Sequence, residues 1–469
     1  MWSDGPMTED SSTTQTTPLA TAISGLSMRG IGPAFMGGRI ADLAVHPANK
    51  STWYLAVGSG GVWKTTNAGT TWSPIFDDQQ SFSIGCVTLD PNQPDIVWVG
   101  TGEAVSGRHV AWGDGVYRSR NGGATWDHMG LRQSEHIAEI LVDPRDSDVV
   151  YVAAEGPLWS GDGQRGVYKT TNGGESWHQA LRIDADTGVT SLAFAPDDPD
   201  TLYAAAYQRR RRVWSFLGGG PGSAIYKTSN GGDSWREITH GLPKGDMGKI
   251  GLAVTPASPD TVYATVEADA ETRGFYRSTD RGESWERRNE YISGGTGPHY
   301  YQEIFASPTD PERVYQVDVF VHWTPDGGKT IQRLETGRTK HSDNHLVWID
   351  PDDGDHLLIG ADAGLYETFD HGESFRHVPN LPISQFYRVA TDNAEPFYNI
   401  LAGAQDLGTL YGPSRTTGVE GVRSQDWSVT LGADGYHVAF DPEDPNICYM
   451  EWQNGNVMRM DRRTMELQD

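Results

Sequence analysis

A short segment that recurs along the chain constrains the fold more than any other feature. It is clearest at residues 167–177, which read Val-Tyr-Lys-Thr-Thr-Asn-Gly-Gly-Glu-Ser-Trp. The alternation of apolar and polar residues in its first half predicts a half-buried strand. The Asn-Gly-Gly that follows predicts a tight turn, because an Asn side chain can bond nearby backbone N–H groups and glycine adopts positive φ. The Ser-Trp then begins a returning strand.

The copies of this segment are evenly spaced. Clear copies end at Trp72, Trp126, Trp177, Trp235 and Trp285, and looser ones end at Ile331, Phe375 and Trp427. A period of about 50 residues indicates one supersecondary unit repeated along the chain. Upstream of most turns lie an apolar strand, an Asp-Pro-like corner and a short second strand, so each unit is predicted to hold four strands. Four-stranded blades around a channel form a β-propeller, which leaves few unpaired sheet edges.

The turn motif, Ser/Thr-x-Asp/Asn-x-Gly-x-Ser/Thr-Trp, resembles the Asp-box, or bacterial neuraminidase repeat. The longer pattern, over roughly residues 28–463, is similar to sortilin-like bacterial proteins often labelled glycosyl hydrolases, and distantly to xyloglucanases of glycoside hydrolase family 74. It includes residues 29–40, His341-Ser-Asp-Asn-His345 and Gly403-Ala-Gln-Asp406. The resemblance implies an all-β propeller. Proteins with this box include enzymes, receptors and a photosystem assembly factor, so the box implies a fold rather than one function.

The repeat divides the chain into three predicted parts. Residues 1–23 are rich in Ser and Thr and lack periodicity, which predicts a disordered tail. Residues 24–380 are predicted to form a seven-bladed propeller, and residues 381–469 the opening blades of a second one. The last unit is predicted to stop at residue 461, before a fourth strand, so we expect a C-terminal partner to cover its edge. The alternative is one larger ring, with blades eight and nine in residues 381–469 and a strand at 24–31 completing the last blade.

Charge and composition limit the partners. The net charge is −26, from 37 basic and 63 acidic residues, which argues against nucleic acids and anionic membranes as partners. No stretch has the length and apolarity of a transmembrane helix, so membrane insertion is not expected. The resembling proteins are mostly exported, so the resemblance implies a secreted or periplasmic location, although the sequence shows no signal peptide. Cys86 and Cys448 are predicted to be buried thiols rather than a disulfide.

Propeller geometry predicts one functional face. In antiparallel blades, the start of each innermost strand and the end of each second strand lie on one side, and the Asp-box turn lies on the other. The second-strand ends are mostly acidic and include Glu103, Glu155, Glu267, Asp318, Asp362, Asp406 and Glu451. The innermost-strand starts include Arg39, His136, Tyr300, Asp343 and Asp434. From these two sets and one long loop we predict a ligand-binding group of Arg39, His136, Glu155, Trp214, Tyr300 and Asp434.

Glycoside hydrolysis requires two carboxyl groups beside the scissile bond, and Glu103, Asp362 and Asp406 are the predicted catalytic residues. The resemblance to xyloglucanases implies an Asp in the first blade, in a Thr-Asp-x-Gly-Gly segment. The matching stretch here has Gly58 at that position, so the chain departs from the pattern. Sialidase chemistry is disfavoured, because an acidic rim would repel an anionic sugar.

Two further patterns have open interpretations. His341, Asp343 and His345 alternate along a predicted strand and form an acceptable ligand set for zinc or another divalent ion. Alternatively, they are hydrogen-bonded polar residues that line the channel. The four arginines at 209–212, with Trp214, are predicted in a long loop of the functional face. That loop either binds a carboxylate or an acidic partner, or forms a solvated tip.

The sequence therefore predicts a carbohydrate-directed β-propeller that binds or hydrolyses a polysaccharide. The alternative is a sortilin-like receptor or an assembly scaffold without catalysis, which binds an extended peptide or protein segment. Aromatic side chains in the long loops would stack on sugar rings. Exposed apolar patches and free strand edges would favour a peptide.

Overall fold

The structure is a computed structural model that describes residues 23, 25–27, 29–35, 38–107, 110–294, 297–335 and 339–469. Its strands form nine antiparallel sheets, eight of four strands and one with an added hairpin strand. The predicted all-β fold of four-stranded units is confirmed. The tail predicted at residues 1–23 lies, apart from Ile23, outside the described residues. Within those ranges no helix is long and apolar enough to cross a membrane.

The first four sheets contain β1 to β17. They are β1 (Ile40–Val45), β2 (Trp53–Val57), β3 (Gly61–Thr65) and β4 (Ser73–Pro74); β5 (Ile84–Leu89), β6 (Val97–Thr101), β7 (Val116–Ser119) and β8 (Asp127–His128); β9 (Ile137–Asp143), β10 (Asp146–Ala154), β11 (Gly166–Thr170) and β12 (His178–Leu181); and β13 (Thr187–Ala195), β14 (Asp198–Arg212), β15 (Ser215–Gly218), β16 (Ala224–Thr228) and β17 (Arg236–Ile238).

The next three sheets continue the same order. They are β18 (Ile250–Val254), β19 (Val262–Val266), β20 (Gly274–Ser278) and β21 (Glu286–Asn289); β22 (Ile304–Ala306), β23 (Val314–Gln316), β24 (His322–Thr324) and β25 (Gln332–Arg333); and β26 (Asn344–Ile349), β27 (Leu357–Ala361), β28 (Gly364–Thr368) and β29 (Arg376–His377).

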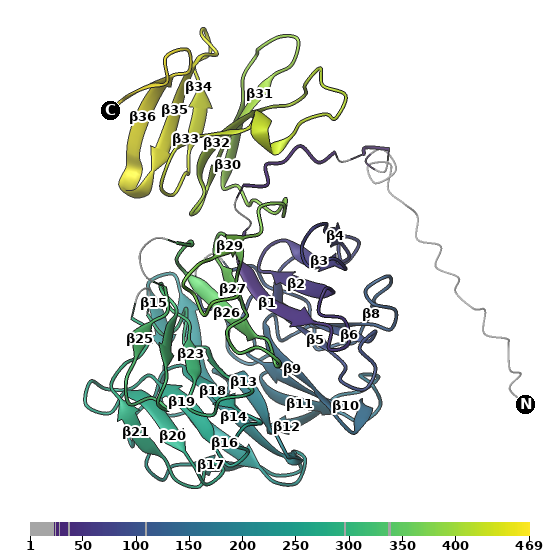
Figure 1. The fold of residues 1–469 in the computed structure, drawn as a ribbon, viewed down its shortest axis with the longest axis vertical. Coiled ribbons are helices and arrows are strands. Elements are labelled where there is room, and N and C mark those ends of the chain that lie inside the picture. The colour runs from purple at the N-terminus through teal and green to yellow at the C-terminus, as the bar shows by residue number, and fades with distance from the viewer. Residues whose placement is uncertain are drawn as a thin grey trace, which may run out of the picture.

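The eighth and ninth sheets lie apart from β1–β29 in Figure 1. They are β30 (Arg388–Thr391), β31 (Asn399–Ala404), β32 (Gly408–Pro413) and β33 (Ser428–Leu431), with the short 3-10 helix η1 (Ser424–Asp426); and β34 (Val438–Phe440), β35 (Ile447–Trp452), β36 (Asn456–Asp461) and β37 (Glu466–Gln468), with η2 (Gln453–Gly455). We refer to β30–β37 as the second unit.

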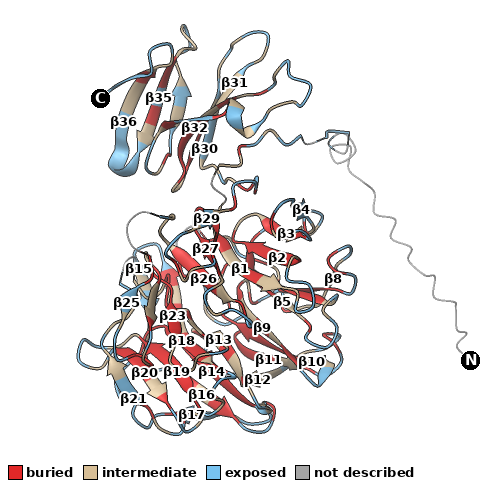
Figure 2. Ribbon diagram, viewed as in Figure 1, coloured by how far each residue is buried: buried red, intermediate tan, exposed pale blue. Residues whose placement is uncertain are grey.

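The first seven sheets surround a common channel. Their innermost strands β1, β5, β9, β13, β18, β22 and β26 contact one another in this order, and β1 also contacts β26 and β27. Ile40 of sheet one packs with Leu346 and Leu365 of sheet seven, so the first and seventh sheets share one apolar cluster. Figure 2 shows the buried residues concentrated along these sheets, with exposed residues in the outer turns. The division of the chain at residue 380 stays a prediction.

The Asp-box turns are held by side chains within the turn. Asn172 Oδ1 accepts a hydrogen bond from the Ser176 N–H at 3.0 Å, and Thr170 Oγ1 accepts one from the Gly174 N–H at 3.0 Å. The returning Trp177 donates its indole N–H to the Met129 carbonyl at 2.6 Å, and Met129 follows β8 of the preceding sheet. The box therefore fixes its own turn and also joins neighbouring sheets.

Two sequence expectations about the chain's last units are wrong. The ninth sheet has a fourth strand, β37, which pairs with β36 through a tight hairpin in which Met465 adopts a φ of 60°. The hairpin closes without an Asp-box, so the turn motif could not reveal it. Residues 25–27 and 29–31, within the segment expected to complete a larger ring, contain no strand. Cys86 and Cys448 are buried free thiols, as expected.

We predict that Trp177→Ala destabilises the fold by about 2–3 kcal/mol, because it removes a large half-buried side chain and its hydrogen bond to the preceding sheet. Thermal and denaturant unfolding would measure the change. Trp214→Ala is the control, since Trp214 is 80% exposed and should leave the unfolding midpoint almost unchanged. Equal effects of the two substitutions would contradict the structural role of the Asp-box Trp.

Candidate functional site

Arg39, just before β1, binds two of the predicted catalytic carboxylates. Its Nη1 donates to Glu103 Oε1 at 2.6 Å, and its Nε donates to Asp362 Oδ1 at 2.6 Å. The guanidinium also lies over the Tyr300 ring, 5.1 Å from the centroid. Burial opposes the positive charge, but Glu103 and Asp362 outweigh it and raise the pKa of Arg39 well above its ordinary value. Arg39 is therefore a fixed cation at the channel mouth.

Asp362, which follows β27, is bound from two sides. His345 Nε2 lies 2.7 Å from the same Oδ1 that accepts the Arg39 hydrogen bond. Burial raises the pKa of this carboxyl, but Arg39 and then His345 outweigh burial and hold the pKa well below its usual range. Asp362 is therefore ionised at neutral pH.

Asp406 has the opposite protonation. It follows β31 of the second unit with a φ of 60°, and its backbone N–H donates to Asp434 Oδ1 at 2.9 Å. Burial, followed by the negative charges of Asp362 and Asp434, raises the pKa of Asp406 to about 8. At neutral pH this carboxyl carries a proton. Two carboxyl groups with pKa values moved apart are the usual basis of an acid and base pair.

A small cavity, of about 30 Å³, joins these groups. All three predicted catalytic residues line it, and its full lining is Gly38, Arg39, Ser59, Glu103, Asp362, Gln385, Tyr387, Gln405, Asp406 and Leu407. The sequence did not indicate Tyr387, whose hydroxyl donates to Gln405 Oε1. Arg39 was placed at the start of an innermost strand because it lies eight residues before the corner residue Pro47, whereas the eighth unit has Asp392 without a following Pro. The Asp392 corner alone could have revealed the segment.

Gly58 leaves room for Glu103. A Cβ atom placed on Gly58 would lie 2.3 Å from Glu103 Oε1, which is far inside van der Waals contact. The Glu103 carboxylate therefore occupies the space that a side chain at position 58 would require. Where the xyloglucanase pattern has an Asp, this chain therefore has Gly58, and the Glu103 carboxylate of the next sheet lies beside it.

Several carboxylates of the acidic rim expected from the second-strand ends have internal partners. Glu155 is buried and its Oε2 lies 2.7 Å from Arg209 Nη1, with both side chains 1% exposed. Asp318 Oδ2 accepts a hydrogen bond from the Tyr291 hydroxyl at 2.8 Å. Together with the pairs of Glu103 and Asp362 to Arg39, these contacts leave few free carboxylates facing the mouth. The Glu155 side chain, which we predicted to contact a ligand, is therefore not accessible from the surface.

The arginines at 209–212 lie in β14, and the expectation of a basic loop is wrong for them. β14 runs beyond its neighbours and turns into β15, so Arg209 and Arg211 are buried. Arg211 Nε donates to the Ser106 carbonyl at 2.7 Å, and its guanidinium lies 4.3 Å from the Phe216 ring centroid. A run of four cations favours a loop in sequence, but here backbone pairing with β15 and buried partners stabilise a strand. Trp214, at the hairpin tip, is exposed.

Loops from several sheets meet over the channel mouth. Val105, Val110, Leu158, Tyr300 and Tyr301 form one buried apolar cluster, which we call the mouth cluster. Its members come from the loops after β6 and β10 and before β22, so it spans blades on different sides of the ring. Beneath it lies a chamber of about 370 Å³ lined by the innermost strands. The mouth cluster therefore packs loops of sheets two, three and six together.

The metal pattern does not have the expected geometry. β26 begins at Asn344, and Asp343 before it has a φ of 63°, so His341, Asp343 and His345 do not alternate along one strand. The hydroxyl of Tyr301 donates to Asp343, His341 Nδ1 lies 2.9 Å from the Ser342 carbonyl, and His345 binds Asp362. Among the described residues, no group of three or more His, Cys, Asp or Glu could hold a metal ion. The divalent metal stays a prediction without structural support.

Two other predicted ligand contacts have internal partners. His136 is buried, with Nδ1 2.8 Å from the Glu103 carbonyl. Burial, followed by the charge of Arg209, lowers the pKa of His136 to about 3, so the ring is neutral. Asp434 accepts the backbone N–H of Asp406. Both residues thus hold loops of the site in place, and their predicted contact with a ligand stays a prediction.

Comparison with known proteins agrees with the resemblance seen in the sequence. A sequence profile for sortilin, neurotensin receptor 3, matches residues 114–274. A xyloglucanase from Hypocrea jecorina is 25% identical over 418 residues, covering 71% of this chain and 47% of that protein. An oligoxyloglucan-reducing end-specific xyloglucanase from Emericella nidulans is 23% identical over 218 residues, covering 43% of this chain and 24% of that protein. The chain thus spans less than half the length of these curated relatives.

Solved structures give the same picture of the fold. A glycoside hydrolase family 74 xyloglucanase from Xanthomonas campestris superposes with a TM-score of 0.61 at 14% identity, covering 94% of this chain and 74% of that chain. An ancestral family 74 enzyme superposes with a TM-score of 0.58 at 15% identity, covering 93% and 69% of the two chains. At such identities the likeness concerns the fold alone. The predicted sortilin-like and xyloglucanase-like resemblance is confirmed.

We predict that Arg39→Ala lowers stability by about 3–5 kcal/mol, because it leaves two buried carboxylates without their cation. The midpoint of thermal unfolding at neutral pH measures the loss. Arg463→Ala is the matched control, since the half-exposed Arg463 pairs with the partly exposed Asp444 and Asp461, and surface ion pairs contribute little. A stable Arg39→Ala variant would contradict the buried ion pairs.

We also predict that Asp406→Asn changes how stability depends on pH. The pKa of Asp406, about 8 in the folded protein, lies above its unfolded value near about 4. The stabilisation from the protonated carboxyl is therefore fully present below pH ~4 and lost as pH rises towards ~8. Relative to wild type, the Asn variant should gain stability across that range. The measurement is the unfolding midpoint of both proteins from pH 4 to 9. A difference between them that does not change with pH would show that Asp406 is ionised throughout and would contradict the prediction.

Proposed function

We propose that the protein binds a neutral polysaccharide across the loop face of sheets two to four. The observation that carries this proposal is a set of exposed tryptophans, Trp112, Trp159 and Trp214, which are 69%, 46% and 80% exposed. They lie in the loops that follow β6, β10 and β14, which are the second strands of successive sheets. Aromatic rings presented in this way stack on sugar rings.

The charge of the face supports an uncharged ligand. The second-strand carboxylates Glu103, Glu155 and Asp362 are held by internal pairs with Arg39 and Arg209, so these three groups are not free to bind a basic partner. An uncharged polyhydroxylated chain does not require such a charge. The resemblance to xyloglucanases makes xyloglucan the first polysaccharide to test. We also propose an extracytoplasmic location, in line with exported proteins of this kind.

The peptide-receptor alternative receives less support. A peptide held in the channel would have to pass the loops that the mouth cluster packs together. The remaining route for a peptide is pairing with a free strand edge. A polysaccharide instead requires only the outer surface of the loops, where the three tryptophans lie.

We also propose that the protein hydrolyses the bound polysaccharide. Asp406 is the proposed general acid, because it carries a proton at neutral pH, and Asp362 is the proposed base. The cavity between them holds a volume near that of one water molecule, which is too small for a sugar ring. Cleavage therefore requires the second unit, which supplies Asp406, to shift away from Arg39 and Asp362 when a chain binds.

The first experiment is a panel of soluble polysaccharides that includes xyloglucan, with reducing-end release and retardation in affinity gels read in parallel. Retardation without release defines a binding module. Release defines an enzyme. Absence of both signals with every polysaccharide would contradict the proposal and favour a peptide receptor or scaffold.

We predict that replacing Trp112, Trp159 and Trp214 together with Ala weakens retardation by at least tenfold, because each stacked ring contributes about 1 kcal/mol or more. Phe369→Ala is the matched control. Phe369 is 62% exposed but follows β28 on the Asp-box side of the ring, so its loss should leave binding unchanged. Equal losses from both variants would place the sugar elsewhere.

If the panel reveals cleavage, Asp406→Asn should reduce the rate by about 100-fold or more while retardation persists, because the variant lacks the proton donor. The pH profile separates a chemical role from a structural one. The wild-type rate should fall above pH ~8, where Asp406 ionises, and the residual rate of the variant should not follow this decline. An unaltered rate in the variant would exclude Asp406 as the acid.

A further inference from the structure

Neighbouring sheets of the ring are joined by one recurring contact. In each case an aromatic residue of the second strand faces a Lys or Arg of the third strand. The facing pairs are Tyr54 with Lys64, Trp98 with Arg118, Tyr151 with Lys169, and Tyr203 with Lys227. The cation lies within 5.8 Å of the aromatic ring centroid in all four. We call these the bridging pairs.

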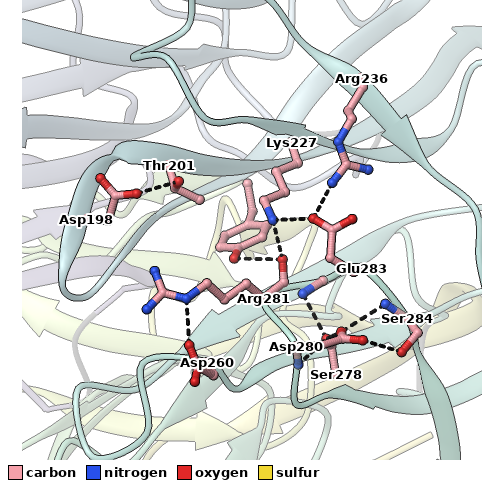
Figure 3. A network of polar contacts seen from close by, with 12 residues as sticks. Asp198, Thr201, Lys227, Arg236, Asp260, Ser278, Asp280, Arg281, Glu283 and Ser284 are labelled. Carbon is pink, nitrogen blue, oxygen red and sulfur yellow. Dashed lines mark hydrogen bonds and ion pairs between the residues drawn. The ribbon is translucent and has the colours of Figure 1, made fainter.

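Each bridging pair binds the next sheet at the same place. Lys169 Nζ and the Tyr151 hydroxyl donate to the Gly231 carbonyl at 2.6 and 2.8 Å. Lys227 Nζ and the Tyr203 hydroxyl donate to the Arg281 carbonyl at 2.7 and 3.0 Å, and Figure 3 shows Lys227 reaching Arg281. Both carbonyls belong to the residue after the Asn or Asp of an Asp-box.

The other two pairs follow the same pattern. Lys64 Nζ donates to the Gly122 carbonyl at 2.8 Å, and Arg118 Nη1 donates to the Gly173 carbonyl. All four acceptor residues have a positive φ, between 58° and 64°. The recurring contact is therefore specific to the conformation of the Asp-box turn, and it joins each of sheets one to four to the sheet that follows it.

The ninth sheet contains the same pair in the same register. Tyr449 is the eighth residue after Asp441 of its corner, as Tyr151 is after Asp143, and it faces Arg459 on the third strand. The described residues contain no tenth sheet beyond it. The Tyr449 hydroxyl and Arg459 Nη1 make only long contacts inside their own sheet, to Asp441 at 3.3 Å and Gln468 at 3.3 Å.

The apolar neighbours of the pair are also exposed. Val457, two residues before Arg459, is 55% exposed, whereas its equivalents are 0–1% exposed in sheets one to four: Val62, Val116, Val167 and Ile225. Tyr449 is 36% exposed, whereas Tyr54, Tyr151 and Tyr203 are 0–1% exposed. The opposite face of sheet nine is covered, because Cys448, Met450 and Met460 pack against sheet eight. The outward face thus has the composition of an interface between blades.

We infer that the outward face of β34–β37 is an interaction surface for a further Asp-box blade, which residues 1–469 do not supply. The partner presents an aliphatic sheet face to Val457 and Tyr449, and a box-turn carbonyl to Arg459 and the Tyr449 hydroxyl. This inference is independent of the polysaccharide and of the carboxylates at the channel mouth. The contact inferred for this face is the one that the four bridging pairs make between sheets of the ring.

The test uses this chain's own second blade, residues 82–131, as the probe. The probe is fused after Asp469 of the full chain through a flexible Gly/Ser linker, which supplies a millimolar effective concentration. Amide hydrogen exchange by mass spectrometry should slow by roughly tenfold or more in β35 and β36, and the probe itself should become protected. Exchange in β1–β29 should not change.

Two controls connect the effect to the bridging pair. The fusion with Tyr449→Ala and Arg459→Ala should lose the protection of β35 and β36. In the chain without the probe, Arg459→Ala should leave the unfolding midpoint unchanged, while Lys169→Ala, at the equivalent position of sheet three, should lower it. This difference is expected only if Arg459 has no partner sheet among the described residues.

Three outcomes would overturn the inference. Unchanged exchange in β35 and β36 beside a protected probe would show that the face does not receive the blade. An unprotected probe would show the same, since a surface built for a blade should order one held beside it. Concentration-dependent dimerisation of the unfused chain, with protection of β35 and β36, would identify a second copy as the occupant instead.

Discussion

The structure depends on the contact between one sheet and the Asp-box turn of the next. Lys169 and Tyr151 bind the Gly231 carbonyl from one side, while Trp177 binds the Met129 carbonyl of the preceding sheet on the other. A blade buries its apolar faces only against neighbours, so these polar contacts set the spacing and rotation at which the faces meet. Because the Asp-box motif specifies both the turn and the joint, the repeat can be followed through the chain although the aligned blades differ in most other residues.

This arrangement separates stability from chemistry. The box turns hold the sheets together at one side of the ring, so the loops at the other side are free to vary in length and composition. There the long β14–β15 hairpin buries Arg209 against Glu155, and Tyr300 and Tyr301 join the cluster over the channel. The loops are thereby packed near the channel and exposed at their tips, where Trp159 and Trp214 lie. A packed base with exposed aromatic tips suits binding of an extended ligand without large ordering of the loops.

The sequence predicted the sheets well because their signals are local: a strand pattern, a corner and a turn within one period. It also selected Arg39, Glu103, Asp362 and Asp406 by position. It could not predict their pairing, since Arg39 is 64 residues from Glu103 and 323 from Asp362, and only closure of the ring brings them together. The sequence-based predictions were wrong where a local pattern had more than one structural interpretation. The positive φ of Asp343 breaks the alternation assumed for a metal site, and the arginines of β14 resemble a loop until their buried partners are known.

The unequal protonation of the carboxyl groups follows from a shortage of cations. Arg39 is the cation that pairs directly with Glu103 and Asp362, and Asp406 lies close enough to feel the negative charge of Asp362. Burial disfavours the ionised form of Asp406, and the negative charges of Asp362 and Asp434 add to this cost, so the carboxyl without a direct cation retains its proton. Asp406 belongs to the second unit, whereas Arg39 and Asp362 belong to the ring. The proton on Asp406 therefore depends on contact between the two parts, and separating them would allow Asp406 to ionise at neutral pH.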